Sequence, residues 1–187
     1  MSEKRGKRPS PPGISASDDV ESMIRVDHAG EYGAVRIYEG QLAVLGNRAG
    51  AKKTAAAIRK MALQEQDHLK AFDQLINERR VRPTALEPVW RVAGFALGAV
   101  TALMGEKAAM ACTAAVEDVI DEHYGEQIAR LDGDPALKRD IEKFRADEVA
   151  HKNEALAQGA EEAPGYKLLS ESIKAGCRLA IKLSERI

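Results

Sequence analysis

Apolar residues recur at intervals of three and four along most of the chain, with charged residues between them, which is the period of an amphipathic α-helix. No segment alternates apolar and polar residues over the length of a convincing strand. Turn-forming residues interrupt the pattern at Gly46, Gly50, Pro83 and Asp132–Pro135. The sequence therefore predicts an all-α fold, with helices at about 18–46, 51–80, 106–131, 135–158 and 166–187.

The stretch Val92–Gly105 differs from these helices because it carries no charged residue. As a helix it is about 21 Å long, short of the roughly 30 Å hydrocarbon core of a bilayer, so we do not expect it to span one. Trp90 and Arg91 precede it, and residues of these types anchor segments at a membrane surface. Two interpretations stay open: a helix lying in a membrane interface, or a buried crossover between two halves of a bundle. Gly94 and Gly98 favour close packing against another helix.

Residues 1–17 combine basic residues with proline and contain no apolar run, so we predict a disordered tail, followed by one domain over residues 18–187. The tail has neither the apolar core of a secretory signal nor the pattern of a convincing mitochondrial presequence. A net charge of -1 provides no basic field, which makes nucleic acid an unfavourable partner. Cys112 and Cys177 are too few for a disulfide framework and are expected to be reduced thiols.

The candidate chemistry lies in two Glu-x-x-His pairs, each preceded by a single Glu on another predicted helix; together these residues are Glu31, Glu65, His68, Glu117, Glu148 and His151. Residues three apart share a helix face, so each pair can hold one metal ion. The single glutamates are 86 positions apart and the pairs 83, which indicates an internal duplication. Apolar neighbours place each Glu on an inward face, where an uncompensated carboxylate is costly. We interpret the six as ligands of two metal ions; the alternative is glutamates on solvated helix faces and surface histidines.

Carboxylates with one imidazole per metal suit iron or manganese better than zinc, calcium or magnesium, and we expect two iron ions. Glu65 and Glu148 are predicted to bridge them, with one further Glu and one His completing each side. Asp147 is the first candidate to accept the second N–H of a ligand imidazole, and Asp67 is the second. For Asp147 a solvated helix position is the alternative. Three more residues are candidates for lining substrate access or relaying protons, with hydrogen-bonded packing as the alternative: His28, His123 and Tyr124.

Four segments closely resemble a known family: RVDHAGEYGAVRIY, RKMALQEQDHLKAF, GFALGAVTALMGEKAAMACTAAVEDVI and AGCRLAIKLSERI. The family is that of the demethoxyubiquinone hydroxylases of ubiquinone biosynthesis, and the resemblance covers about Val20 to Ile187. All six candidate ligand positions carry the residue types of that family. The resemblance implies a ferritin-like four-helix bundle built from two helix-pair repeats, with the apolar segment as a crossover and an additional C-terminal helix.

The resemblance also implies an activity, in which a di-iron monooxygenase uses O2 to hydroxylate the ring of a polyprenylated demethoxy-benzoquinone or quinol. It implies NADH as reductant, a lipid-binding accessory protein as partner, and a peripheral position on a bacterial inner membrane (cytoplasmic face) or a mitochondrial inner membrane (matrix face). The chain has no glycine-rich strand-to-helix turn on which to place a nicotinamide cofactor. Two alternatives remain: a soluble ferritin-like ferroxidase or peroxide scavenger, and a metal-free helical scaffold.

Overall fold

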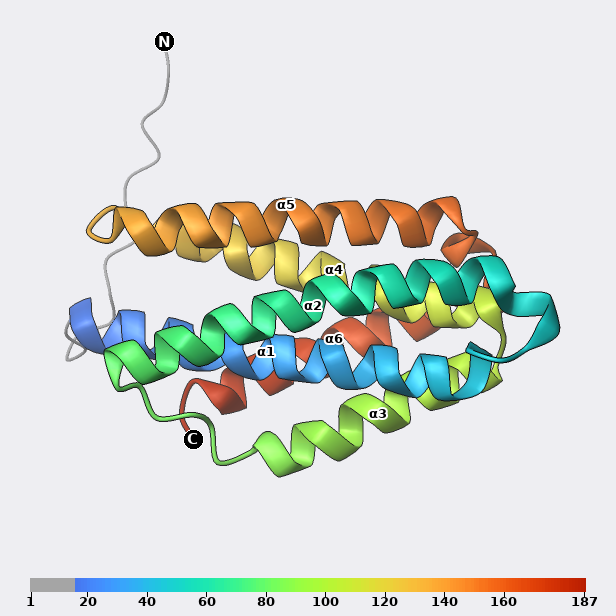
Figure 1. The fold of residues 1–187 in the computed structure, drawn as a ribbon, viewed down its shortest axis with the longest axis horizontal. Helices are drawn as coiled ribbons and strands as arrows, with labels where there is room; N and C mark the ends of the chain where they lie inside the picture. The colour runs from blue at the N-terminus through green and yellow to red at the C-terminus, as the bar shows by residue number, and fades with distance from the viewer. Residues whose placement is uncertain (1–15) are drawn as a thin grey trace, which may run out of the picture.

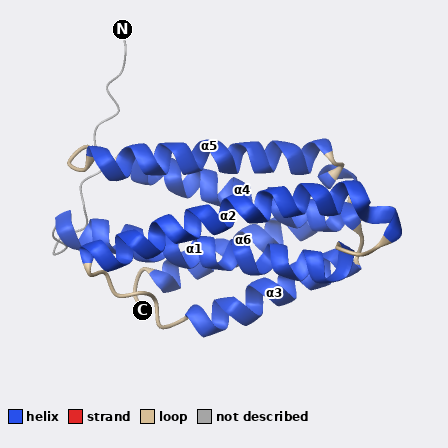
Figure 2. Cartoon of the chain, viewed as in Figure 1, coloured by secondary structure: helices blue, strands red, loops and turns tan. Residues whose placement is uncertain are grey.

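The computed structural model describes residues 16–187, which form α-helices and short 3₁₀ turns, with no strand in that range (Figures 1 and 2). In chain order the elements are α1 (Ala16–Leu45), η1 (Ala49–Ala51), α2 (Lys52–Arg79), α3 (Glu87–Leu103), α4 (Glu106–Ile128), α5 (Pro135–Ala157), η2 (Ala160–Glu162) and α6 (Tyr166–Ser184). The predicted all-α class is confirmed, and the predicted helix ends lie within three residues of the observed ones. The prediction of a disordered tail concerns residues outside the described range, except for Ala16 and Ser17 at the start of α1.

Local chemistry explains where the helices begin and end. Asp134 caps α5 because its carboxylate accepts a hydrogen bond of 3.1 Å from the backbone N–H of Leu137, and Pro135 occupies the first helical position. After α2, Arg80 adopts a left-handed conformation with φ 55°, and its N–H bonds to the carbonyl of Asn77. These turns reverse the direction of the chain, so consecutive helices run antiparallel, as the colours from blue to red in Figure 1 show.

Helices α1, α2, α4 and α5 form the bundle, while α3 packs against α1 and α6 packs against α4 from outside (Figure 1). One large apolar cluster fills one end of the bundle and includes Leu45, Ile58 and Met110. Another fills the opposite end and includes Phe72 and Leu137. The candidate ligands come from the middle of the four bundle helices, between these two clusters.

Helix α3 approaches α1 closely through glycine. A Cβ atom at Gly98 would lie 2.0 Å from the carbonyl oxygen of Ile37, and one at Gly40 would lie 2.1 Å from that of Phe95. Both distances are far below van der Waals contact, so a side chain at either position would push the two backbones apart. The close packing predicted for the Gly94 and Gly98 pair is confirmed, since a Cβ at Gly94 would also meet α1.

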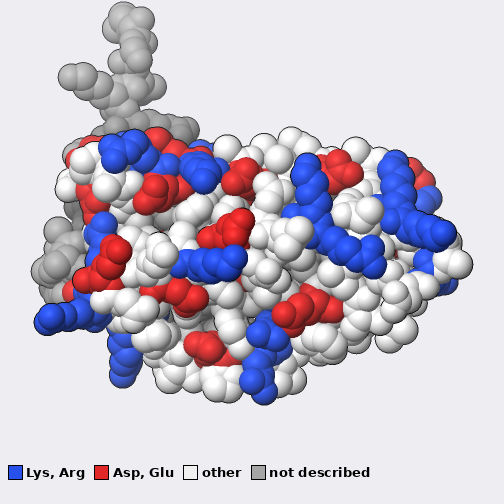
Figure 3. All heavy atoms as spheres, in the orientation of Figure 1, with Lys and Arg blue, Asp and Glu red and all other residues white. Residues whose placement is uncertain are grey.

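The other side of α3 is apolar and exposed. Its exposed large side chains are Val89, Val92, Phe95, Val100 and Leu103, followed by Met104. Helix α3 is therefore a crossover between the two halves of the bundle, but it is covered on one side only. Among residues 16–187, no helix has both the length and the apolar character that crossing a bilayer requires. On the face shown in Figure 3, acidic and basic side chains are interspersed, as expected for a net charge of -1.

Candidate metal centre

The six candidate ligands meet in the interior of the bundle. Glu31 comes from α1, Glu117 from α4, and the two Glu-x-x-His pairs from α2 and α5. Each of the six residues is at most 3% exposed. The alternative in which the glutamates lie on solvated faces and the histidines on the surface is therefore wrong. Four buried carboxylates in one core need compensation by cations, protons or hydrogen bonds.

The ligand atoms fall into two overlapping sets, one of Glu31, Glu65, His68 and Glu148, the other of Glu65, Glu117, Glu148 and His151. Within each set the atoms lie within 4.8 Å of one another. Each imidazole contacts the glutamate of the other pair: His68 Nδ1 lies 3.1 Å from Glu148 Oε1, and His151 Nδ1 lies 2.9 Å from Glu65 Oε1. Glu65 and Glu148 belong to both sets, so each of these carboxylates could serve two metal ions.

Apart from contacts with one another, the atoms that point into this centre have no hydrogen-bond partner within the described residues. They are Glu31 Oε2, both carboxylate oxygens of Glu65 and of Glu148, Glu117 Oε2, and Nδ1 of His68 and His151. Buried polar atoms without partners are rare in native proteins because each loses the hydration of the unfolded chain. Every one of the six side chains contributes at least one such atom, and all belong to types that bind transition metals, so the centre fits a pair of metal ions.

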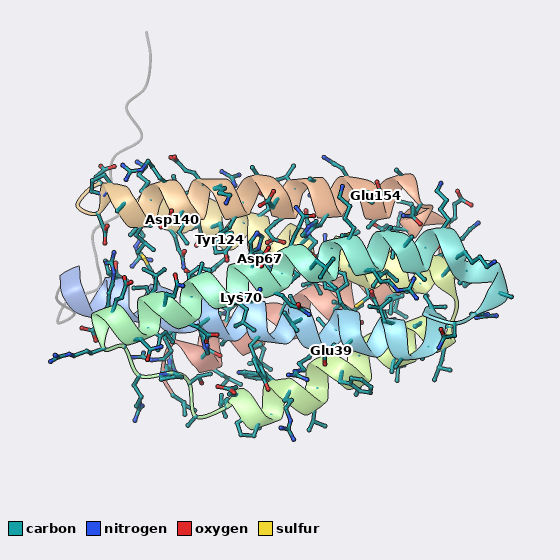
Figure 4. The ribbon with its side chains drawn as sticks, viewed as in Figure 1. Glu39, Asp67, Lys70, Tyr124, Asp140 and Glu154 are labelled. Carbon is teal, nitrogen blue, oxygen red and sulfur yellow. The ribbon has the colours of Figure 1, made fainter. Side chains whose placement is uncertain are left out.

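Two tyrosines orient the outer glutamates by crossing the bundle. Tyr38, seven residues after Glu31, donates a hydrogen bond of 2.7 Å to Glu117 Oε1. Tyr124, seven residues after Glu117, donates to Glu31 Oε1. The internal duplication seen in the ligand spacing thus extends to the residues that hold the ligands. Of the two, Tyr124 was a sequence candidate, and Figure 4 labels it; Tyr38 was missed, although the shared spacing of seven would have revealed it.

The outward-facing nitrogen of each histidine also has a partner. His68 Nε2 lies 3.1 Å from Asp147 Oδ2, and His151 Nε2 lies 3.3 Å from Gln64 Oε1. Asp147 directly precedes Glu148 and Gln64 directly precedes Glu65, so these contacts again follow the duplication. Since a carboxylate only accepts, Nε2 of His68 carries the hydrogen and Nδ1 keeps its lone pair for a metal. Sequence reasoning proposed Asp147 and missed Gln64.

Asp67, the other proposed partner of a histidine, lies elsewhere. Its side chain is 76% exposed and pairs with Lys70 at 2.9 Å on the solvent side of α2, where Figure 4 shows both residues. The physical reason is helix geometry: Asp67 lies about 100° around α2 from His68, on the side turned to solvent, whereas Gln64 and Asp147 lie on sides turned toward the facing helix. The structure therefore does not bring Asp67 to the centre.

His123 and His28 lie in separate polar contacts outside the ligand sets. His123 Nε2 is 3.1 Å from Asp27 Oδ1, which also accepts a hydrogen bond of 2.7 Å from Gln127. His28 Nε2 is 3.0 Å from Asp73 Oδ1. Hydrogen bonds within the packed interior account for the position of His123. His28, in contrast, lines a surface groove.

Burial and mutual repulsion change the acidity of the cluster. Burial, followed by repulsion from neighbouring carboxylates, raises the pKa of Glu65 and of Glu117 well above the ordinary value of 4.5. Burial acts to lower the pKa of His68, but hydrogen bonds with Glu148 and Glu31 outweigh it and raise that pKa to about 10. Burial lowers the pKa of His151. Without metal the cluster thus holds protons that divalent cations would displace.

A four-helix bundle with two Glu-x-x-His pairs and two further glutamates facing one another is the arrangement found in bundle proteins with carboxylate-bridged binuclear metal centres. The family model of the ubiquinone biosynthesis protein COQ7 matches residues 18–184, and the chain belongs to this family. It is 54% identical over 169 residues to the 3-demethoxyubiquinol 3-hydroxylase of Rhodospirillum rubrum, covering 90% of this chain and 78% of the relative. It is 53% identical over 173 residues, with the same coverage, to the human protein named NADPH-dependent 3-demethoxyubiquinone 3-hydroxylase, mitochondrial.

Proposed function

We propose that this protein is a di-iron monooxygenase that hydroxylates the ring of a polyprenylated demethoxyubiquinol or demethoxyubiquinone. The names of the relatives supply the reaction class. The observation that carries the proposal is the pair of overlapping ligand sets, whose inward atoms have no hydrogen-bond partner outside the centre within the described residues. Two ferrous ions carry four positive charges, which would balance the four ionised carboxylates and remove the cost of burying them.

The proposed hydroxylation consumes one O2 molecule and two electrons for each ring. One atom of O2 enters the ring as a hydroxyl group and the other leaves as water, with two electrons from the reductant and the protons that accompany them. When bound, the iron ions would supply the site at which O2 is activated. The residues of the chain hold that site: Tyr38 and Tyr124 fix the outer glutamates, and Asp147 and Gln64 fix the imidazoles. The two apolar clusters exclude water from both ends.

The reductant is a reduced nicotinamide nucleotide. The sequence resemblance implies NADH, whereas the names of the human and Dictyostelium discoideum relatives specify NADPH. Both nucleotides deliver the same hydride, so the difference concerns the binding of one phosphate group. Comparing turnover with each at equal concentration decides between them.

Isotope labelling tests the reaction directly. The iron-loaded protein, supplied with a short-chain demethoxyubiquinol, a nicotinamide reductant and ¹⁸O2, is expected to yield a ring-hydroxylated product with one ¹⁸O atom. Product that carries oxygen from water would contradict a monooxygenase reaction. Iron oxidation without any hydroxylated ring would instead support the ferroxidase alternative.

The exposed apolar side of α3 supports a peripheral position on a membrane, where a polyprenylated substrate resides. Val92 is 67% exposed and Leu103 is 72% exposed. The double substitution Val92→Glu and Leu103→Glu should lower binding to lipid vesicles about tenfold or more, because each side chain contributes roughly 1.5–3 kcal/mol when buried. Vesicle flotation measures this. Leu63→Glu, at an exposed apolar position on α2, is the matched control and should bind like the unchanged protein.

Equal flotation of the α3 variant and the unchanged protein would contradict a membrane role for α3. The membrane proposed is a bacterial inner membrane on its cytoplasmic face or a mitochondrial inner membrane on its matrix face, and several relatives carry the word mitochondrial in their names. A lipid-binding accessory protein belongs to the same proposal, since it would deliver a substrate that is insoluble in water.

A further inference from the structure

A groove with a volume of about 340 Å³ lies where α1, α2 and the segment before α3 meet. Its lining includes Tyr32, which directly follows Glu31, and Leu69, which directly follows His68. Ile76 and Pro83 add further apolar surface. None of the six ligands lines the groove, so it lies outside the metal centre but at the same level along α1 and α2, and its volume is within the range of sites for small molecules.

A fixed carboxylate stands in this groove. His28 is 6% exposed, and its Nε2 lies 3.0 Å from Asp73 Oδ1, whereas the side chain of Asp73 is 57% exposed. The imidazole N–H donates to the carboxylate, and Asp73 retains lone pairs that can accept a hydrogen bond from a bound molecule. A buried residue thus holds an accessible acceptor in place.

The internal duplication shows that the bundle itself does not need this pair. The single glutamates are 86 positions apart, so the counterpart of His28 in the second half is Ala114. The Glu-x-x-His pairs are 83 positions apart, so the counterpart of Asp73 is Leu156. Both counterparts are apolar and pack with the core cluster at one end of the bundle. The polar pair is therefore a departure from the repeat, present only in the half that carries the groove.

The apolar lining of the groove is also a departure. The counterparts of Tyr32 and Leu69 are Asp118 and Lys152, which form an ion pair with each other. Lys174 of α6 also reaches Asp118 at 2.6 Å. The second half is thus closed by charges and by α6 at the place where the first half presents an apolar groove.

We propose that this groove binds the aromatic ring of the substrate in its reduced, hydroquinone form, with Asp73 accepting a hydrogen bond from a ring hydroxyl. His28 is a positioning residue that holds the carboxylate. The proposal rests on the proposed function and decides which redox form of the ring is bound. A hydroquinone hydroxyl can donate to a carboxylate, whereas a quinone carbonyl is itself an acceptor and gains no hydrogen bond there.

The charge of the lining also fits this ligand. Glu87 adds a second carboxylate to the lining. Two negative side chains disfavour the phosphates of a nicotinamide nucleotide, so the groove suits an uncharged ring with hydroxyl groups.

Equilibrium dialysis of the full chain under anaerobic conditions tests the proposal without relying on turnover. The probes are a demethoxyubiquinol with one prenyl unit and the corresponding quinone. The unchanged protein should bind the hydroquinone about tenfold more tightly than the quinone. Asp73→Ala should weaken hydroquinone binding about tenfold and leave quinone binding unchanged. Asp140→Ala, an exposed carboxylate of α5 labelled in Figure 4, is the matched control and should keep the preference.

A second variant tests the location. Leu69→Trp should fill the groove and weaken binding of both ring forms, because the added side chain occupies the space of the ligand. Three results would overturn the proposal: an unchanged preference in Asp73→Ala, unchanged binding in Leu69→Trp, or displacement of the hydroquinone from the groove by NADPH. If the iron-loaded protein fails to hydroxylate but the Asp73-dependent preference is present, the proposed function fails and the binding site stands.

Discussion

Replacing Glu148 with alanine is expected to lower ring hydroxylation by about a thousandfold or more. Glu148 belongs to both candidate ligand sets and is fully buried, so its loss would remove a carboxylate from both proposed metal ions at once. Changes to residues that only orient ligands typically cost 10–100-fold, and the loss of a shared ligand should cost more. Bound iron after desalting should fall together with turnover. The test is to measure the rate of product formation at a saturating concentration of the quinol, and to determine bound iron in the same sample.

Two control variants distinguish loss of metal binding from loss of the fold. Glu148→Gln keeps the shape of the side chain and removes its charge, so helix content by circular dichroism should be retained while iron binding is lost. Glu142→Ala, at an exposed position of the same helix α5, should bind iron and turn over like the unchanged protein. Normal turnover by Glu148→Ala would show that this residue is not a ligand.

Replacing Gly98 with alanine is expected to reduce the free energy of unfolding by about 2–3 kcal/mol, although alanine is the better helix former. The added Cβ would lie 2.0 Å from the carbonyl oxygen of Ile37, which is backbone and cannot rotate away. Helices α1 and α3 must then separate along their whole contact. Urea unfolding followed by circular dichroism measures the change.

The matched control is the same substitution at Gly176 of α6, where an added Cβ would meet nothing within 4 Å. Gly176→Ala should increase the free energy of unfolding by about 0.5–1 kcal/mol, because alanine loses less backbone entropy than glycine on folding. Opposite signs for the two variants are the expected result. Equal effects at both positions would show that α3 does not pack on α1 as closely as described.

The sequence predicts most of the fold because the relevant signals are local. Helix ends follow from turn residues such as Asp134 and Pro135, whose effect needs no distant partner. The ligand set follows from the spacing of three in Glu65/His68 and Glu148/His151, since that spacing fixes a common helix face before any packing is known. A Glu that shares an apolar stripe must face the core, and burial of all six candidates agrees with this argument.

The contacts that cross the bundle could not be predicted in the same way. The distance from Tyr38 to Glu117 depends on how far α1 slides along α4, and no local pattern sets that register. The same holds for His151 with Gln64. The duplication is the one signal that reaches across helices, because it requires equivalent contacts in both halves: Tyr124 with Glu31, and His68 with Asp147.

The position of α3 depends on atomic contact and could be predicted only in part. Its apolar composition suits a membrane interface or a buried crossover equally well, and Gly94 with Gly98 indicates close packing without naming the partner. The structure provides that partner, α1, and leaves Val92 and Leu103 exposed. A helix packed on one side and apolar on the other combines features of both interpretations.

The six buried side chains of the metal centre are proposed to hold two iron ions together. The most direct measurement is to load the purified full chain with ferrous iron under anaerobic conditions, remove unbound metal by desalting, and determine iron per chain. Two iron ions per chain are expected in the unchanged protein. A chain that retains its helix content and binds no iron would contradict the proposal.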